Sequence, residues 1–264
     1  MQGASAGLAD GGRRIAWIDA VRGVAMVWMT VFHFCFDLNQ RGWLQANFYQ
    51  DAFWTLQRTA IVSLFVFCAG LGQAVALQQG QNAARFWRRW GQIAVCALLV
   101  SAASYPMFPR SYIYFGVLHG MAVMLLLVRW TPLGARGWTL VGAVALVLPW
   151  AAQALHAQGV WMEALDGRAM NWLGLISHKP ITEDYVPLLP WLGLMAWGMA
   201  AGQRLLNHPS HPLERWSAQL AHGPLARPAR LLSTLGRFSL SYYMLHQPVL
   251  IGGLMLISTL TSTA

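Results

Sequence analysis

Seven long apolar stretches set the first limit on what this chain can fold into. They cover residues 15–38, 59–79, 90–108, 112–130, 137–155, 186–206 and 235–260. A helix needs about 20 apolar residues to cross the hydrocarbon core of a bilayer. Only 10% of the 264 residues are charged, against about 25% in a soluble domain, so few ions remain to cover a soluble globule. The sequence therefore predicts an all-α, polytopic bundle of about seven transmembrane helices.

The basic residues between these stretches predict an orientation. Cytoplasmic loops of membrane proteins carry an excess of Lys and Arg. With the N-terminus inside, twelve basic residues fall on the cytoplasmic side and five on the opposite side. We therefore expect the N-terminus in and the C-terminus out, with residues 1–13 as a cytoplasmic tail and 14–264 as one membrane-embedded domain. Because the net charge of +9 is spread over several membrane rims, we expect no nucleic-acid partner.

The first apolar stretch carries four ionisable side chains, which are costly in a membrane helix and usually face the bundle interior. At about 100° per residue, Asp19, Arg22, His33 and Asp37 share one narrow stripe. Asp19 and Arg22 are three residues apart and can pair, while His33 and Asp37 are four apart and can form a hydrogen bond. A carboxylate beside an imidazole is the arrangement of a general base. The alternative is that both pairs only lock the first helix against its neighbours.

Several sequence blocks resemble one family of membrane enzymes. The run 18–23 (IDAVRG), followed by Met29, His33 and Asp37, resembles the opening of bacterial relatives of the heparan-α-glucosaminide N-acetyltransferase catalytic domain family. The spacing of Arg22 and His33 is also similar to the Arg-x10-His motif of membrane acyltransferases that acetylate cell-surface sugars. The later blocks that resemble the family are 65–70 (FVFCAG), 112–120 (YIYFGVLHG), 184–193 (DYVPLLPWLG) and 236–249 (GRFSLSYYMLHQPV).

The resemblance, which runs from Arg14 to about Gly252, implies a membrane-bound acyltransferase. We expect it to move an acyl group, with acetyl as the expected case, from cytosolic acyl-CoA to a sugar-like hydroxyl or amine acceptor on the outer side of a bacterial inner membrane. His33, oriented by Asp37, would either deprotonate the acceptor or accept the acyl group itself. We expect no metal and no haem, and a homo-oligomer is compatible with the sequence.

The donor would bind at the cytoplasmic side of the membrane. Arg22 precedes His33 by eleven residues, about 16 Å along a helix, so the two would contact different parts of one elongated ligand. A basic cluster before the third stretch would receive the phosphates of coenzyme A, although anionic lipid headgroups alone would also account for it. The predicted donor-binding residues are Asp19, Arg22, Arg85, Arg88 and Arg89.

Five residues in the later blocks form a second tier of candidates. His119 and His246 lie near the middle of their stretches, with Gln247 next to the second of them. A lone membrane histidine more often makes an interhelical hydrogen bond than it acts in catalysis. Asp184 and Tyr185 lie where the sixth stretch begins, and would orient the acceptor or simply form a polar helix entry.

The match departs from the animal enzymes of this family in two ways. They have Asn where His33 stands, with the working His further along, and they carry an extra lumenal portion. Their glucosaminide acceptor is therefore not carried over.

The competing hypothesis is a proton-coupled small-molecule transporter that uses Asp19, His33 and Asp37 as a relay. The missing inverted repeat counts against it. A third class, a haem-binding carrier with histidine axial ligands, lacks a covalent haem motif.

Overall fold

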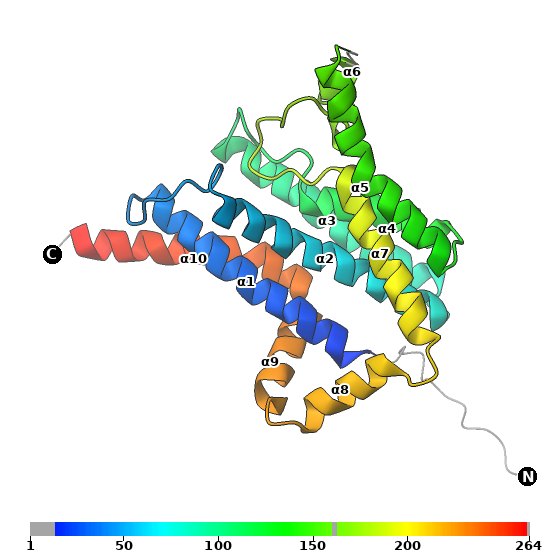
Figure 1. Cartoon of the computed structure of the whole chain (residues 1–264). Helices are drawn as coiled ribbons and strands as arrows, with labels where there is room; N and C mark the ends of the chain where they lie inside the picture. Colours follow the sequence, from blue (N-terminus) through cyan, green and yellow to red (C-terminus); the bar gives the residue numbers. More distant parts are fainter. Residues whose placement is uncertain (1–13, 160–162, 263–264) are drawn as a thin grey trace, which may run out of the picture.

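The computed structural model describes residues 14–159 and 163–262 as a bundle of helices (Figure 1). The predicted tail, residues 1–13, lies outside the described residues. Within the described ranges no β-strand element forms, which confirms the all-α class. The α-helices are α1 (Ala16–Gln40), α2 (Ala52–Gln78), α3 (Ala83–Met107), α4 (Val117–Trp130), α5 (Ala135–Ala157), α6 (Glu163–Asp166), α7 (Leu188–Leu206), α8 (Pro212–His222), α9 (Ala226–Arg237) and α10 (Ser239–Ser262). A short 3-10 helix, η1, covers Asn171–Leu173.

Five helices are long and apolar enough to cross a membrane by length and composition, namely α1, α2, α3, α5 and most of α10. Their outer surfaces suit contact with lipid, since Leu98, Leu140 and Val249 are 67%, 66% and 68% exposed. The chain is therefore a multi-pass membrane protein. α4 has only 14 residues, and α7 carries the polar pair Gln203 and Arg204 near its end. The count of seven spans and their orientation remain predictions.

The helix α7 packs between α2 and α5 at the centre of the bundle. α4 packs against both α2 and α7, and α3 packs against α4. The largest buried side chains here include Met124 of α4 and Met195 and Met199 of α7. On the other part of the molecule α1 contacts α2, α9 and α10, and Figure 1 shows α10 crossing behind α1, with its C-terminal part extending beyond it.

Glycines allow the closest helix crossings, as is common where helices pack inside a membrane. A Cβ on Gly70 of α2 would overlap the backbone carbonyl oxygen of Met195 in α7. A Cβ on Gly198 of α7 would likewise overlap the backbone carbonyl oxygen of Phe67 in α2. The backbones of the two central helices therefore approach each other at a distance that no larger residue would permit.

The crossing of α1 and α9 also depends on glycines. A Cβ on Gly23 of α1 would overlap the carbonyl oxygen of Leu232, and a Cβ on Gly236 of α9 would overlap the carbonyl oxygen of Asp19. α8 adds a second contact to the start of α1, where the rings of Trp17 and Trp216 are 5.0 Å apart. These contacts fix the position of the charged beginning of α1.

The beginning of α4 differs from the prediction, which places a helical span from residue 112. The segment 112–116 instead lies against the segment 182–186. Thr182 Oγ1 donates a hydrogen bond to the carbonyl oxygen of Tyr112 (2.9 Å), and the Val186 N–H donates to that of Phe115 (3.3 Å). The backbone groups of residues 112–116 are thus engaged outside a helix, so α4 begins only at Val117.

The tight crossing of α1 and α9 leads to a test of stability. We expect Gly236→Val to reduce the free energy of unfolding by about 1–3 kcal/mol, because the new side chain forces α9 away from α1. The measurement is a thermal melt of the purified protein in detergent.

Gly252→Val in α10 is the matched control, since no atom lies within 4 Å of a Cβ built on Gly252. An equal loss of stability in both variants would show that the crossing does not limit stability.

Candidate active site

Asp19 is the centre of a charged cluster at the start of α1. Arg22 Nη1 donates a hydrogen bond to Asp19 Oδ1 at 3.1 Å, and Arg14 Nη1 lies 3.8 Å from Asp19 Oδ2. The ion pair between Asp19 and Arg22 is the one that their helical spacing predicts. The other terminal nitrogen of Arg22 lies 3.5 Å from the position that a Cβ on Gly72 would occupy. The guanidinium group therefore packs against α2 at a point where α2 has no side chain.

The first turns of α3 add more positive charge to this cluster. The charge of Arg89 interacts with those of Arg14, Arg22 and Arg88, and with that of Asp19. The Asp19 carboxylate thus interacts with the guanidinium groups of Arg14, Arg22 and Arg89, and a bound polyanion would balance the excess positive charge. A shallow hollow on this side of α3 is lined by Asn82, Ala84, Arg85 and Arg88.

The three predicted arginines before the third span are part of a helix. α3 begins at Ala83, because the Asn82 side chain accepts a hydrogen bond from the Arg85 N–H (2.9 Å) and caps the helix. Arg85, Arg88 and Arg89 therefore occupy the first two turns of α3 rather than the preceding connector.

Near the other end of α1, His33 and Asp37 meet α10. The ring of His33 contacts the ring of His246 edge to face, with 5.1 Å between centroids. Asp37 Oδ1 accepts a hydrogen bond from Gln247 Nε2 at 2.8 Å. The predicted hydrogen bond between His33 and Asp37 is absent from the described part of the chain; Asp37 bonds to α10, and its second oxygen has no partner there. Four predicted residues from opposite ends of the sequence thus form one cluster, here called the α1–α10 site.

Two tyrosines and a threonine complete the α1–α10 site, and sequence reasoning missed all three. The Thr30 Oγ1 and Tyr242 hydroxyls are 2.6 Å apart and join α1 to α10. The ring of Tyr242 is parallel to that of His246 at 6.1 Å, and the ring of Tyr243 lies 5.7 Å from it. Two tyrosines within one turn of a membrane histidine are the signal that could have identified them.

His119 has a structural role at the beginning of α4. The Gly116 N–H donates a hydrogen bond to His119 Nδ1 (3.2 Å), so Nε2 of the neutral ring carries the hydrogen. Nε2 then donates to Ser101 Oγ (3.1 Å), which donates to the Ile113 carbonyl oxygen (2.6 Å). Because both ring nitrogens are engaged, the geometry favours the hydrogen-bonding role over a catalytic one.

Asp184 also holds the beginning of α4. Its Oδ2 accepts a hydrogen bond from the Val117 N–H at 2.8 Å, the position where a carboxylate stabilises a helix N-terminus. Burial raises the pKa of Asp184, against the opposing effects of this hydrogen bond and of the Lys179 charge. The contacts thus give Asp184 the anchoring role that the sequence leaves open as an alternative.

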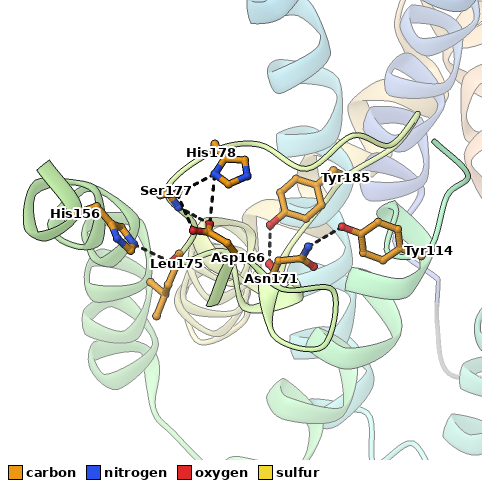
Figure 2. Close-up of polar contacts among 8 residues, drawn as sticks. All are labelled: Tyr114, His156, Asp166, Asn171, Leu175, Ser177, His178 and Tyr185. Atoms are coloured by element: carbon orange, nitrogen blue, oxygen red, sulfur yellow. Dashed lines mark hydrogen bonds and ion pairs between the residues drawn. The ribbon is translucent and has the colours of Figure 1, made fainter. Parts of the chain in front are cut away.

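Tyr185 belongs to a network of the loop residues that precede α7 (Figure 2). Its hydroxyl donates to the backbone oxygen of Asn171 (2.6 Å), and Asn171 Nδ2 donates to the Tyr114 hydroxyl (2.8 Å). Burial raises the pKa of Tyr185, and the charge of Asp166 acts in the same direction. Asp166 itself accepts two hydrogen bonds from Ser177, which close the neighbouring loop.

Comparison with known proteins identifies the family of the chain. The family model described as heparan-alpha-glucosaminide N-acetyltransferase, catalytic, matches residues 14–248. That range contains the charged cluster at the start of α1 and all the residues of the α1–α10 site. No curated protein and no solved structure matches the chain. The match covers most of the sequence, so the chain belongs to the heparan-α-glucosaminide N-acetyltransferase catalytic family.

Proposed function

We propose that the chain is an integral membrane acyltransferase of the bacterial cytoplasmic membrane. It would take an acyl group, acetyl being the expected case, from cytosolic acyl-CoA and transfer it to a sugar-like acceptor on the outer side. Membership of the family implies a membrane acetyltransferase-like activity. The proposed donor and the proposed direction of transfer rest on one observation. α1 has a cationic cluster at its start and the α1–α10 site near its end.

The cationic cluster is the proposed donor site. Coenzyme A carries several phosphates, and arginine binds phosphate through paired, charge-assisted hydrogen bonds. Arg22 is held in place by Asp19, while Arg88 and Arg89 approach from α3. The excess of basic residues predicted for this side of the membrane agrees with a ligand that arrives from the cytosol.

The α1–α10 site is the proposed site of acyl transfer. It lies about 16 Å along α1 from Arg22, so an elongated donor held by its phosphates would present its thioester there. His33, which the sequence predicts to deprotonate the acceptor or to take the acyl group, lies in this site beside His246. Asp37 stabilises the positive charge that develops on the imidazole, and Gln247 keeps Asp37 in place.

The acceptor would approach from the opposite face of the membrane. Coenzyme A is large and charged and does not cross a bilayer readily, whereas a site reached from both faces needs neither substrate to cross. The segment around Asp184 and Tyr185 would then shape the acceptor entrance, through its contacts with the beginning of α4 and with Asn171.

The first test is transfer of label from radiolabelled acetyl-CoA to an envelope fraction, in membranes that contain either the wild type or His33→Ala. We expect transfer by the wild type and a loss of at least about 10²-fold in the variant, because His33 lies in the proposed site of transfer.

Equal transfer by both proteins would remove His33 from the mechanism. If neither protein transferred label from several acyl-CoAs, the transporter hypothesis would take the place of this one.

A second test concerns the donor site. We expect Arg22→Gln to raise the KM for acyl-CoA about 10- to 100-fold, because a charge-assisted hydrogen bond to phosphate contributes about 1.5–3 kcal/mol. Steady-state rates at saturating acceptor would measure the change.

Arg136→Gln is the matched control, since it removes an equal charge from the exposed beginning of α5. A similar rise in KM in both variants would indicate a general effect of membrane charge.

A further inference from the structure

Three buried polar atoms of the α1–α10 site have no hydrogen-bond partner among the described residues. They are Asp37 Oδ2, His246 Nε2 and Gln247 Oε1. Asp37 and His246 are only 7% and 8% exposed, so solvent reaches neither side chain freely. A buried polar atom without a partner costs about 1–3 kcal/mol, and three in one place indicate a site whose partners come from a bound molecule.

The hydrogen bonds of His246 determine which of its nitrogens is basic. Nδ1 lies 2.7 Å from the backbone oxygen of Tyr243, one turn earlier in α10. A carbonyl oxygen can only accept, so Nδ1 carries the hydrogen of the neutral ring. The lone pair is therefore on Nε2, the atom that lacks a partner. His246 is thus held in the tautomer that presents a free base within the site.

The groups around His246 suit the uptake of one proton. From α1 it faces His33, in direct ring contact, while Asp37 is bonded to the neighbouring Gln247. From α10 itself it is flanked by Tyr242 and Tyr243. The contact between the two imidazole rings disfavours a second positive charge, so the pair takes up one proton. Arg41, after the end of α1, acts on Asp37 through its charge.

We propose that His246, rather than His33, is the base that deprotonates the acceptor, an assignment that rests on the proposed acyl transfer. Nε2 takes the proton of the acceptor hydroxyl or amine as that oxygen or nitrogen bonds to the thioester carbonyl carbon. The carbon–sulfur bond breaks, the thiolate of coenzyme A leaves, and the proton passes from Nε2 to the sulfur. His246 thereby returns to its starting form, and the ring of His33 remains to contact the acyl group.

Two substitutions of His246 test whether activity depends on the basic nitrogen or only on the shape and hydrogen bonds of the side chain. His246→Asn keeps an amide N–H near the position of Nδ1, where it can still donate to the Tyr243 carbonyl oxygen, but has no atom at Nε2. His246→Gln places a non-basic amide near Nε2. We expect each to lower the rate of transfer about 10²- to 10⁴-fold. Binding of acetyl-CoA, measured by titration calorimetry on the intact purified protein, should stay within about twofold and would report a correctly folded donor site.

The pH profile distinguishes catalysis from support of the structure. The wild-type rate should fall in acid with the protonation of one histidine. We expect His33→Gln to be slower but to keep this acidic limb, whereas the residual rate of His246→Asn should be independent of pH over the same range.

The opposite pattern, with the limb lost in His33→Gln and kept in His246→Asn, would overturn the assignment. So would a His246→Gln protein as active as the wild type. A wild type that transfers no acyl group at all would instead overturn the proposed function.

Discussion

Close backbone contact between helices is the constraint on which the rest of this structure depends. Lipid tails are as apolar as leucine, so apolar side chains alone give two helices little reason to prefer each other over lipid. Gly70 and Gly198 bring α2 and α7 together, and Gly23 and Gly236 do the same for α1 and α9. Because α1 carries the ionisable stripe, its position against α9 determines where those groups lie.

The negative charges of the two buried carboxylates of α1, Asp19 and Asp37, have different surroundings. Asp19 is surrounded by guanidinium groups, which leave that end of the helix strongly positive. Asp37 is bonded to a neutral amide, and one of its oxygens has no partner among the described residues. A permanent cationic site suits phosphates that remain ionised throughout a reaction. A carboxylate with spare capacity suits a place where positive charge appears and disappears.

Sequence reasoning gives the right contact for one pair of residues on α1 and the wrong one for the other. The helical period places Arg22 beside Asp19, since three residues separate them. The same argument pairs His33 with Asp37, but the structure joins Asp37 to Gln247, 210 residues away, and no local pattern reports such a contact. The likeness of block 236–249 to the family marks His246 and Gln247 as candidates without indicating what they touch.

The beginning of α4 shows a second limit. The residues from Tyr112 to Gly116 are apolar enough to resemble the first turn of a span. Their backbone groups bond to the segment before α7, and Asp184 then takes the position that caps α4. Hydropathy cannot distinguish an apolar loop that pairs with a distant segment from an apolar helix. The tertiary partner decides between them.

The joining of α1 to α10 also has a consequence for biosynthesis. A ribosome adds about 5–20 residues per second, so roughly 10–40 s separate the synthesis of Asp37 from that of Gln247. During that interval α1 is already made, and its second carboxylate has no amide to bond. The beginning of α1 also waits for late parts of the chain, because α8 and α9 hold it in place. The α1–α10 site forms only when α10 enters the membrane, so both ends of α1 reach their final surroundings near the end of synthesis.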